Sequence, residues 1–283
     1  MQLEKYHALG NDYLVFDAQN NQEILNEEQI RLICHRNFGF GSDGILYGPI
    51  FDENRIKVKI YNPDGSEAEK SGNGVRIFSK FLKDFGYIKD EQFTLSTLGG
   101  DVKVQYLNDE GSSMRVLMGK TTCVSTQIPA TGEEREIINE VMEFNGQEYR
   151  ATCVSIGNPH CIIPMEDISK EKAVALGSYV ENSPYFPNRI NMQLLEVIDR
   201  NHIKIEIYER GAGYTLASGS SSCAASTAAY RLGLIDSSVT VHMPGGDILI
   251  EIMPDSSVYM TGEVKRIGTF ILSDDFYSEI NVI

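Results

Sequence analysis

The stretches AEKSGNGVRIF (68–78) and LASGSSSCAAS (216–226) together decide the fold of this chain. Each contains a Ser-Gly step, at Ser71 and at Ser218, ahead of a run of small and apolar residues. Serine is a favoured residue at a helix N-cap and glycine permits a tight turn, so each step predicts a loop that leads into a helix. The two steps lie 147 residues apart (218 − 71 = 147).

The same offset recurs elsewhere along the chain. The further matches, the last with one residue of drift, are Gly10-Asn11 with Gly157-Asn158, Tyr61 with Tyr208, Gly86 with Gly233, and TLSTLGGDVKV (94–104) with TVHMPGGDILI (240–250). A single match between glycine-rich turns is weak evidence, but this set of matches in register indicates an internal duplication. The alternative is that two unrelated units share the same turn chemistry.

Each half of the repeat combines strands with one central helix. Alternating residues rich in β-branched side chains predict strands at RIKVKIYN (55–62), DVKVQYL (101–107), HIKIEIYE (202–209) and DILIEIM (247–253). Helices are predicted at 72–86 and 220–233, each closed by a glycine, with short additional helices at 27–37 and 168–182. A sheet wrapped around each central helix buries both elements, so we expect an α/β fold of two pseudo-symmetric domains.

The domain boundary is expected at the polar stretch 119–135, where periodicity breaks. This gives an N-terminal domain at 1–118 and a C-terminal domain at 119–269, with residues 270–283 completing the first.

Composition excludes several classes of function. The net charge of −15 argues against a nucleic-acid-binding surface, which needs clustered Lys and Arg. The chain opens without the apolar run of a secretory signal, and it contains no stretch of about 18 apolar residues, so we expect no membrane span. Its five scattered cysteines form no C-x-x-C pair, which favours reduced thiols in a cytoplasmic protein and disfavours a zinc site.

The two Ser-Gly corners suit the capture of a small anion. A helix N-terminus presents unpaired N–H groups and a positive dipole end, so two related N-termini converging on one carboxylate would place a side chain on either side of it. Inverting a stereocentre by proton removal and return needs such an opposed acid and base. Cysteine, with a reference pKa of ~8.5, fits that role, whereas a serine hydroxyl is about as weak an acid as water, at ~15.7. The alternative role for Ser71 and Ser218 is plain N-capping.

Other polar residues lie beside the duplicated turns. They are Asn158 and His160 in GNPH, Asn191 in NRINMQL, and Glu209 and Arg210 in YERGAG. Taken singly, such residues are more often turn formers or surface ion pairs than catalysts. Their position beside the repeated corners makes them candidates for the site.

The segments HALGNDYLVFD, NPDGSEAEKSGNG, GNPHC, FPNRIN, RNHIKIEIYERGAG and SGSSSCAA closely resemble diaminopimelate epimerase, in order and over essentially the whole chain. The resemblance implies two pseudo-symmetric domains, each a barrel-like, mostly antiparallel sheet around a central helix. It implies interconversion of LL- and meso-diaminopimelate by a cytoplasmic homodimer, without pyridoxal phosphate or metal, in lysine and peptidoglycan synthesis.

Site roles carried over from the family fall on matching positions. The α-carboxylate would be bound at the two helix ends by Gly72, Asn73, Gly219 and Ser220. The distal amino-acid group would be held by Asn11, Asn62, Asn158, Asn191, Glu209 and Arg210. His160 and Glu209 would tune the acid/base pair, whose positions are Ser71 and Ser218.

Those two serines are the main departure, because the family motifs C-G-N-G and A-C-G-x-G-x-C place the catalytic cysteines there. Cys223 matches a later, non-catalytic cysteine, and smaller departures are Gly44, where some members carry Gln, and Tyr214, where many carry Glu. Three explanations remain open: an engineered double Cys→Ser variant, a natural serine-bearing epimerase or racemase, or a homologue that kept the pocket for binding or lyase-type chemistry.

Overall fold

The computed structural model describes residues 1–21, 23–52 and 55–282. The chain divides into two units, which are described separately. Unit 1 comprises Met1–Val116 and Gly262–Ile283, and unit 2 comprises Leu117–Thr261. The chain passes from one unit to the other within β8 (Ser113–Lys120) and again within β17 (Ser257–Glu263).

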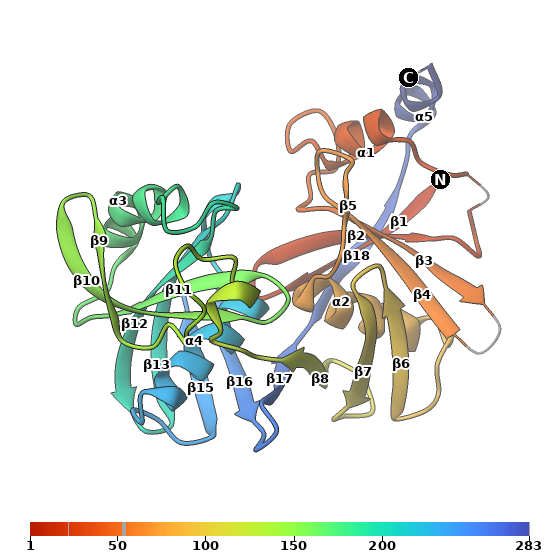
Figure 1. The fold of residues 1–283 in the computed structure, drawn as a ribbon. Helices are drawn as coiled ribbons and strands as arrows, with labels where there is room; N and C mark the ends of the chain where they lie inside the picture. The colour runs from red at the N-terminus through yellow and green to blue at the C-terminus, as the bar shows by residue number, and fades with distance from the viewer. Residues whose placement is uncertain (22, 53–54, 283) are drawn as a thin grey trace. The chain divides into compact units, whose positions relative to one another are not determined.

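Unit 1 is a sheet with its strands in the order β18-β1-β2-β3-β4-β6-β7-β8 (Figure 1). Two neighbours, β2 with β3 and β4 with β6, pair in parallel, and β5 pairs with β4 beside them. The strands are β1 (Gln2–Ala8), β2 (Asn11–Asp17), β3 (Ile45–Asp52), β4 (Arg55–Tyr61), β5 (Glu67–Ala68), β6 (Gln92–Thr97), β7 (Gly100–Tyr106) and β18 (Lys265–Ile271). The helices are α1 (Glu27–Cys34), α2 (Gly72–Asp84) and α5 (Asp274–Val282).

Unit 2 has the same topology, with its strands in the order β9-β10-β11-β12-β13-β15-β16-β17. Again two neighbours are parallel, β11 with β12 and β13 with β15, and the short β14 pairs with β13. The strands are β9 (Glu140–Phe144), β10 (Gln147–Ser155), β11 (Pro159–Pro164), β12 (Asn191–Asp199), β13 (His202–Glu209), β14 (Gly213–Thr215), β15 (Ser238–Met243) and β16 (Gly246–Ile252). The helices are α3 (Lys170–Glu181) and α4 (Gly219–Arg231), with a 3-10 turn at Ser125–Gln127.

Strand registers repeat with the offset seen in the sequence. Leu14 pairs with Ile45 in unit 1, and Cys161 pairs with Met192 in unit 2, each 147 residues later (161 − 14 = 192 − 45 = 147). The central helices α2 and α4 are also offset by 147 residues at both ends (219 − 72 = 231 − 84 = 147). The predicted α/β architecture with an internal duplication is therefore confirmed.

Both central helices end in the same way. Gly86 and Gly233 follow the C-caps with φ of 72° each. The residue after each glycine donates its backbone N–H five residues back, Tyr87 to Leu82 at 2.9 Å and Leu234 to Ala229 at 3.0 Å. This is the Schellman ending that a left-handed glycine permits, so the predicted closing glycines are confirmed.

The two central helices differ in how they fill their units. Helix α2 packs against β1, β2 and β3 with large apolar side chains such as Phe78 and Phe81, while Arg76 on the same helix is also fully buried. Helix α4 contacts six strands of unit 2 and is buried along most of its length, with side chains of Ala, Ser, Thr and Cys. Small side chains let strands approach a helix closely, and α4 has them on nearly every face.

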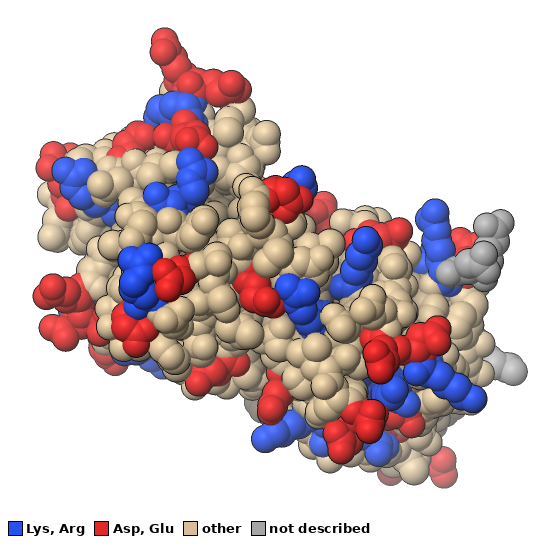
Figure 2. All heavy atoms as spheres, turned by 90° about the horizontal axis from the view of Figure 1, so that it is seen from below, with Lys and Arg blue, Asp and Glu red and all other residues tan. Residues whose placement is uncertain are grey.

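None of the helices in the described part of the chain is both long and apolar enough to cross a membrane. On the face shown in Figure 2, acidic and basic side chains are interspersed, and Lys and Arg form no extended area of their own.

Candidate active site

The first corner is the N-terminus of α2. Ser71 has extended backbone angles (φ −136°, ψ 119°), and its Oγ accepts the Gly74 N–H at 3.0 Å, so it is the N-cap. The backbone N–H groups of Gly72 and Asn73 donate to no group among the described residues. Two free donors at the positive end of a 13-residue helix can bind a carboxylate.

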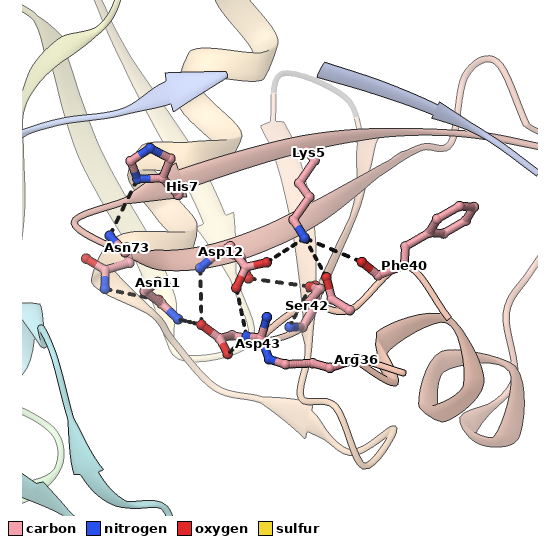
Figure 3. A network of polar contacts seen from close by, with 12 residues as sticks. Lys5, His7, Asn11, Asp12, Arg36, Phe40, Ser42, Asp43 and Asn73 are labelled. Atoms are coloured by element: carbon pink, nitrogen blue, oxygen red, sulfur yellow. Dashed lines mark hydrogen bonds and ion pairs between the residues drawn. The ribbon is translucent and has the colours of Figure 1, made fainter. Parts of the chain in front are cut away.

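Two predicted asparagines meet beside this corner. The side chain of Asn73 donates to Asn11 Oδ1 at 3.0 Å, and Asn11 in turn donates through Nδ2 to Asp43 Oδ2 at 2.8 Å (Figure 3). Buried Arg76, one helical turn along α2, donates to Asn73 Oδ1. The orientation of both amides is therefore fixed by charged partners.

A network of charges holds Asp43 in place. Arg36 bridges Asp43 and Asp12, at 2.6 and 2.9 Å, and Lys5 Nζ lies 2.8 Å from the other Asp12 oxygen (Figure 3). Burial would raise the pKa of Asp12, but the hydrogen bonds from Lys5 and Arg36 outweigh it and hold that pKa below its usual value. Sequence reasoning missed this network, because three of its members lie in separate segments with no shared motif.

Tyr13 was also missed. Its hydroxyl donates to Ser71 Oγ at 3.3 Å, and the side chain is 7% exposed. The repeat offers a signal that could have found it, since Tyr13 lies 147 residues before His160 (160 − 13 = 147).

The second corner is the N-terminus of α4. Ser218 is extended (φ −149°, ψ 125°), and its Oγ accepts the Ser221 N–H at 3.4 Å. The backbone N–H groups of Gly219 and Ser220, like those of the first corner, have no acceptor among the described residues. Burial raises the pKa of the Glu209 carboxyl, and a hydrogen bond from Ser218 opposes that rise.

His160 is at the centre of a neutral hydrogen-bonded chain in unit 2. The fully buried ring lies between two amide oxygens, with Nε2 3.1 Å from Asn158 Oδ1 and Nδ1 3.2 Å from Gln193 Oε1. A neutral imidazole has one N–H and donates it to one of the two oxygens. Those amides continue to α4, Asn158 to Ser220 Oγ at 3.4 Å and Gln193 to Ser221 Oγ at 3.0 Å. Burial lowers the pKa of His160 to about 3, so the ring is neutral at neutral pH.

Asn191 is hydrogen-bonded to Arg210, whereas Asn62 is hydrogen-bonded within its own turn. Asn191 Oδ1 accepts the backbone N–H of Arg210 at 2.9 Å, while the exposed Arg210 guanidinium reaches the Asn188 carbonyl at 3.1 Å. Asn62 follows β4 in a turn and donates to Ser66 Oγ at 3.0 Å. Among the described contacts of unit 1, none joins Asn62 to Asn11, Asn73 or Ser71.

Neither corner has a cysteine or a metal-ligand cluster. All five cysteines are free and buried, and burial raises the pKa of Cys34 to about 12 and that of Cys123 to about 11. Within the described residues, no group of three or more His, Cys, Asp or Glu side chains is arranged to hold a metal ion.

Comparison of the sequence with known proteins shows the family to which the chain belongs. The family model described as diaminopimelate epimerase matches residues 3–124 and 152–267. "Diaminopimelate epimerase 2" of Nostoc sp. strain PCC 7120 is 49% identical over 100% of this chain and 99% of its own. "Diaminopimelate epimerase" of Methanothermobacter thermautotrophicus is 38% identical over 96% of this chain and 98% of its own.

Solved structures share the fold at low sequence identity. A probable proline racemase from Agrobacterium radiobacter K84 has a TM-score of 0.72 at 12% identity, over 99% of this chain and 95% of its own. A PhzF-family phenazine biosynthesis protein from Bacillus anthracis has a TM-score of 0.65 at 16% identity, over 96% and 99%. At these identities the likeness extends to the fold alone.

Proposed function

The chain belongs to the diaminopimelate epimerase family, and from that membership we propose that it interconverts LL- and meso-diaminopimelate. The chemistry is an isomerisation in which a proton leaves the α-carbon and another returns to its opposite face. In this proposal each unit supplies one serine of the acid/base pair, Ser71 and Ser218. The pathway served is lysine and peptidoglycan synthesis, as the family implies.

One observation carries the proposal. Each unit has a helix of 13 residues at the same repeat position, capped by serine, with two unpaired N–H groups in its first turn. We assign these donors, on Gly72, Asn73, Gly219 and Ser220, to the reacting α-carboxylate. A carboxylate at a helix N-terminus is stabilised by the hydrogen bonds and by the helix dipole together.

The distal end of diaminopimelate carries a second amino group and carboxylate. Arg210 supports this assignment, because its backbone is held by buried Asn191 while its guanidinium is exposed and able to pair with a carboxylate. The remaining residues assigned to the distal group are Asn11, Asn62, Asn158 and Glu209.

The competing function is diaminopimelate binding without turnover. It is favoured by one observation: both serines already serve as N-caps, a role that needs no proton transfer. Solvent exchange distinguishes the two functions, because an epimerase must carry ²H from D₂O into the α-position of LL- or meso-diaminopimelate. Binding detected by calorimetry without any ²H incorporation would refute the epimerase proposal for this chain.

We extend the proposal to a homodimer in the cytoplasm that works without pyridoxal phosphate or metal. Sedimentation equilibrium tests the dimer, and a single species of 31.6 kDa would refute it. Activity that survives both hydroxylamine and a chelator is expected, because the proton transfers need only side chains and backbone donors.

A further inference from the structure

The side chain of Ser71 is in contact with a proton donor, the hydroxyl of Tyr13. The Tyr13 hydroxyl lies 3.3 Å from Ser71 Oγ and donates to it, from a ring that is 7% exposed. Tyr13 lies on β2 and Ser71 caps α2, so the contact joins two elements of unit 1 that are far apart in sequence.

The hydrogen bonds around Ser71 leave its own proton free. A serine hydroxyl has two acceptor positions and one donor. One acceptor position takes the Gly74 N–H at 3.0 Å, and the other takes the Tyr13 O–H. The Ser71 proton can therefore be directed to a third group, such as a carbanion.

Acidity explains why a serine would need such a partner. A serine hydroxyl has a pKa near that of water, ~15.7, whereas a tyrosine phenol has a reference pKa of ~10. Serine alone cannot hold the negative charge that develops when it gives up a proton. A phenol that protonates the serine oxygen as it loses its proton moves that charge to a more stable position.

We propose that Tyr13 is the proton relay that lets Ser71 act in place of a thiol. The inference rests on the proposed epimerase function. As an acid, Ser71 O–H gives its proton to the substrate carbanion, forming the Cα–H bond, while Tyr13 O–H protonates Ser71 Oγ and becomes phenolate. As a base, Ser71 takes the Cα proton while its own proton passes to the phenolate. Tyr13 acts through Ser71 and does not itself touch the substrate.

The backbone around Tyr13 reserves space for its ring. Gly44 has a φ of 154°, and its carbonyl accepts the N–H of Leu14, the residue after Tyr13, at 3.1 Å. A Cβ added at Gly44 would lie 2.8 Å from Tyr13 Cε1 and 2.3 Å from the Tyr61 carbonyl oxygen. A side chain at position 44 would clash with the Tyr61 carbonyl and with the tyrosine ring, so glycine at this position leaves room for the ring of Tyr13.

Unit 2 does not repeat the relay. His160 occupies the position equivalent to Tyr13, but its ring nitrogens face the amide oxygens of Asn158 and Gln193 and not Ser218. An ionisable neighbour of Ser218 is Glu209, which accepts a hydrogen bond from it. Ser71 thus accepts a hydrogen bond from its ionisable neighbour, and Ser218 donates one to its own. This difference matches Ser71 to the acid role and Ser218 to the base role.

Tyr13→Phe tests the relay when it is made in two backgrounds. In Ser218→Cys, Ser71 remains and depends on Tyr13; in Ser71→Cys/Ser218→Cys, a thiol replaces it. We expect kcat for diaminopimelate epimerisation to fall by about 10²-fold in the first background, with KM little changed, and by less than about 3-fold in the second. A structural role for Tyr13 would lower kcat equally in both.

The control is Tyr106→Phe, which removes a hydroxyl that bonds to the Ser79 carbonyl farther along α2. It should leave kcat unchanged in both backgrounds. Equal losses for Tyr13→Phe in the two backgrounds, or no loss in the Ser71 background, would overturn the relay. The relay would also be overturned if the Ser218→Cys protein showed no ²H exchange while the double-cysteine protein was active. If the double-cysteine protein is itself inactive, the epimerase function fails, and the relay that rests on it falls too.

Discussion

The two units share a backbone plan and differ in the chemistry that surrounds the helix corner. In unit 1 the Asn11 amide is held by Asp43, which belongs to an ionic network with Arg36, Asp12 and Lys5. In unit 2 the equivalent Asn158 is held by neutral, fully buried His160. The Asn11 amide is thus held by partly exposed charges, and the Asn158 amide by a buried neutral ring.

This difference shows which features a duplicated fold must keep. Register, helix length and the N-caps depend on backbone geometry, and all of them are common to both units. The side chains behind the corners need only hold an amide in place, and several chemistries can do that. A two-base reaction benefits from such divergence, because its two faces need groups of different proton affinity.

The largest expected effect follows from making both corners thiols. Ser71→Cys/Ser218→Cys should raise kcat for epimerisation by about 10³-fold or more, since a thiol is a far stronger acid than a hydroxyl. Replacing serine at the caps should also lower the free energy of unfolding, by about 1 kcal/mol at Ser71 and about half as much at Ser218, whose cap hydrogen bond is longer. Single-turnover kinetics and urea unfolding measure the two effects.

Ser169→Cys provides the matched control, because Ser169 is the N-cap of α3 and lies outside the candidate site. It should lower the free energy of unfolding about as much as the change at Ser218 does, and it should leave kcat unchanged. Little change in kcat for the double variant would mean that the serine corners have been rebuilt for another task.

The second largest effect is expected from lowering the pH, which should destabilise unit 2 before unit 1. Burial holds the pKa of His160 at about 3, below its ordinary value of about 6.5. The unfolded chain therefore gains a proton as pH falls below about 6.5 while the folded chain does not, so stability present at neutral pH is lost down to about pH 3. Between pH 7 and pH 5 the loss from His160 is about 2 kcal/mol.

Unit 1 should respond only at lower pH. The lowered pKa of Asp12 contributes stability that is present above its unfolded value of 3.8 and is lost as pH falls further. Hydrogen exchange at pH 5, read by mass spectrometry, should show unit 2 opening before unit 1. His160→Gln should weaken this pH dependence; an unchanged slope in that variant would mean that another group in unit 2 titrates.

The internal repeat allowed the fold to be predicted from the sequence. It did not allow the side-chain contacts around the two corners to be predicted. Offsets of 147 residues gave the two central helices and their closing glycines, because turns and caps have local signatures. The contact between Tyr13 and Ser71 spans 58 residues (71 − 13 = 58), and Asp43 reaches Asn11 from a loop before β3. Such contacts depend on how strands and loops pack, and no local pattern encodes them.

Asn62 and Gly44 are two positions that the sequence identified but whose surroundings it could not describe. Asn62 was assigned to the site from its motif, and the structure adds that its side chain donates to Ser66 within its own turn. Gly44 was noted as a departure from the family, and the structure shows that a Cβ there would clash with the Tyr61 carbonyl oxygen and with the ring of Tyr13. Sequence identified the positions in both cases, but their surroundings were needed to interpret them.

A smaller effect is expected from Asp43→Asn. The carboxylate uses Oδ2 for Asn11 and for the Asp12 N–H, and Oδ1 for Arg36, whereas an amide has one oxygen and cannot serve both. The Asn11 amide then loses its fixed orientation, so KM for diaminopimelate should rise about 10-fold, which is about 1.4 kcal/mol.

Steady-state kinetics should show kcat within about 2-fold of the parent, because none of the described contacts of unit 1 joins Asp43 to Ser71. Asp52→Asn makes the same change at an exposed ion pair with Lys57 in unit 1 and should alter neither constant. A fall in kcat with KM unchanged would instead place Asp43 in the proton-transfer step.

The smallest expected difference is between the contributions of the two N-caps to the free energy of unfolding. The Gly74 N–H lies 3.0 Å from Ser71 Oγ, but the Ser221 N–H lies 3.4 Å from Ser218 Oγ, near the limit of a hydrogen bond. Ser71→Ala should therefore cost about 1 kcal/mol of unfolding free energy and Ser218→Ala about half as much. Ser169→Ala, whose bond to the Lys172 N–H is 3.3 Å, should resemble Ser218→Ala in urea unfolding. Equal losses at Ser71 and Ser218 would mean that the two corners are equivalent as caps, and that their difference resides only in Tyr13 and Glu209.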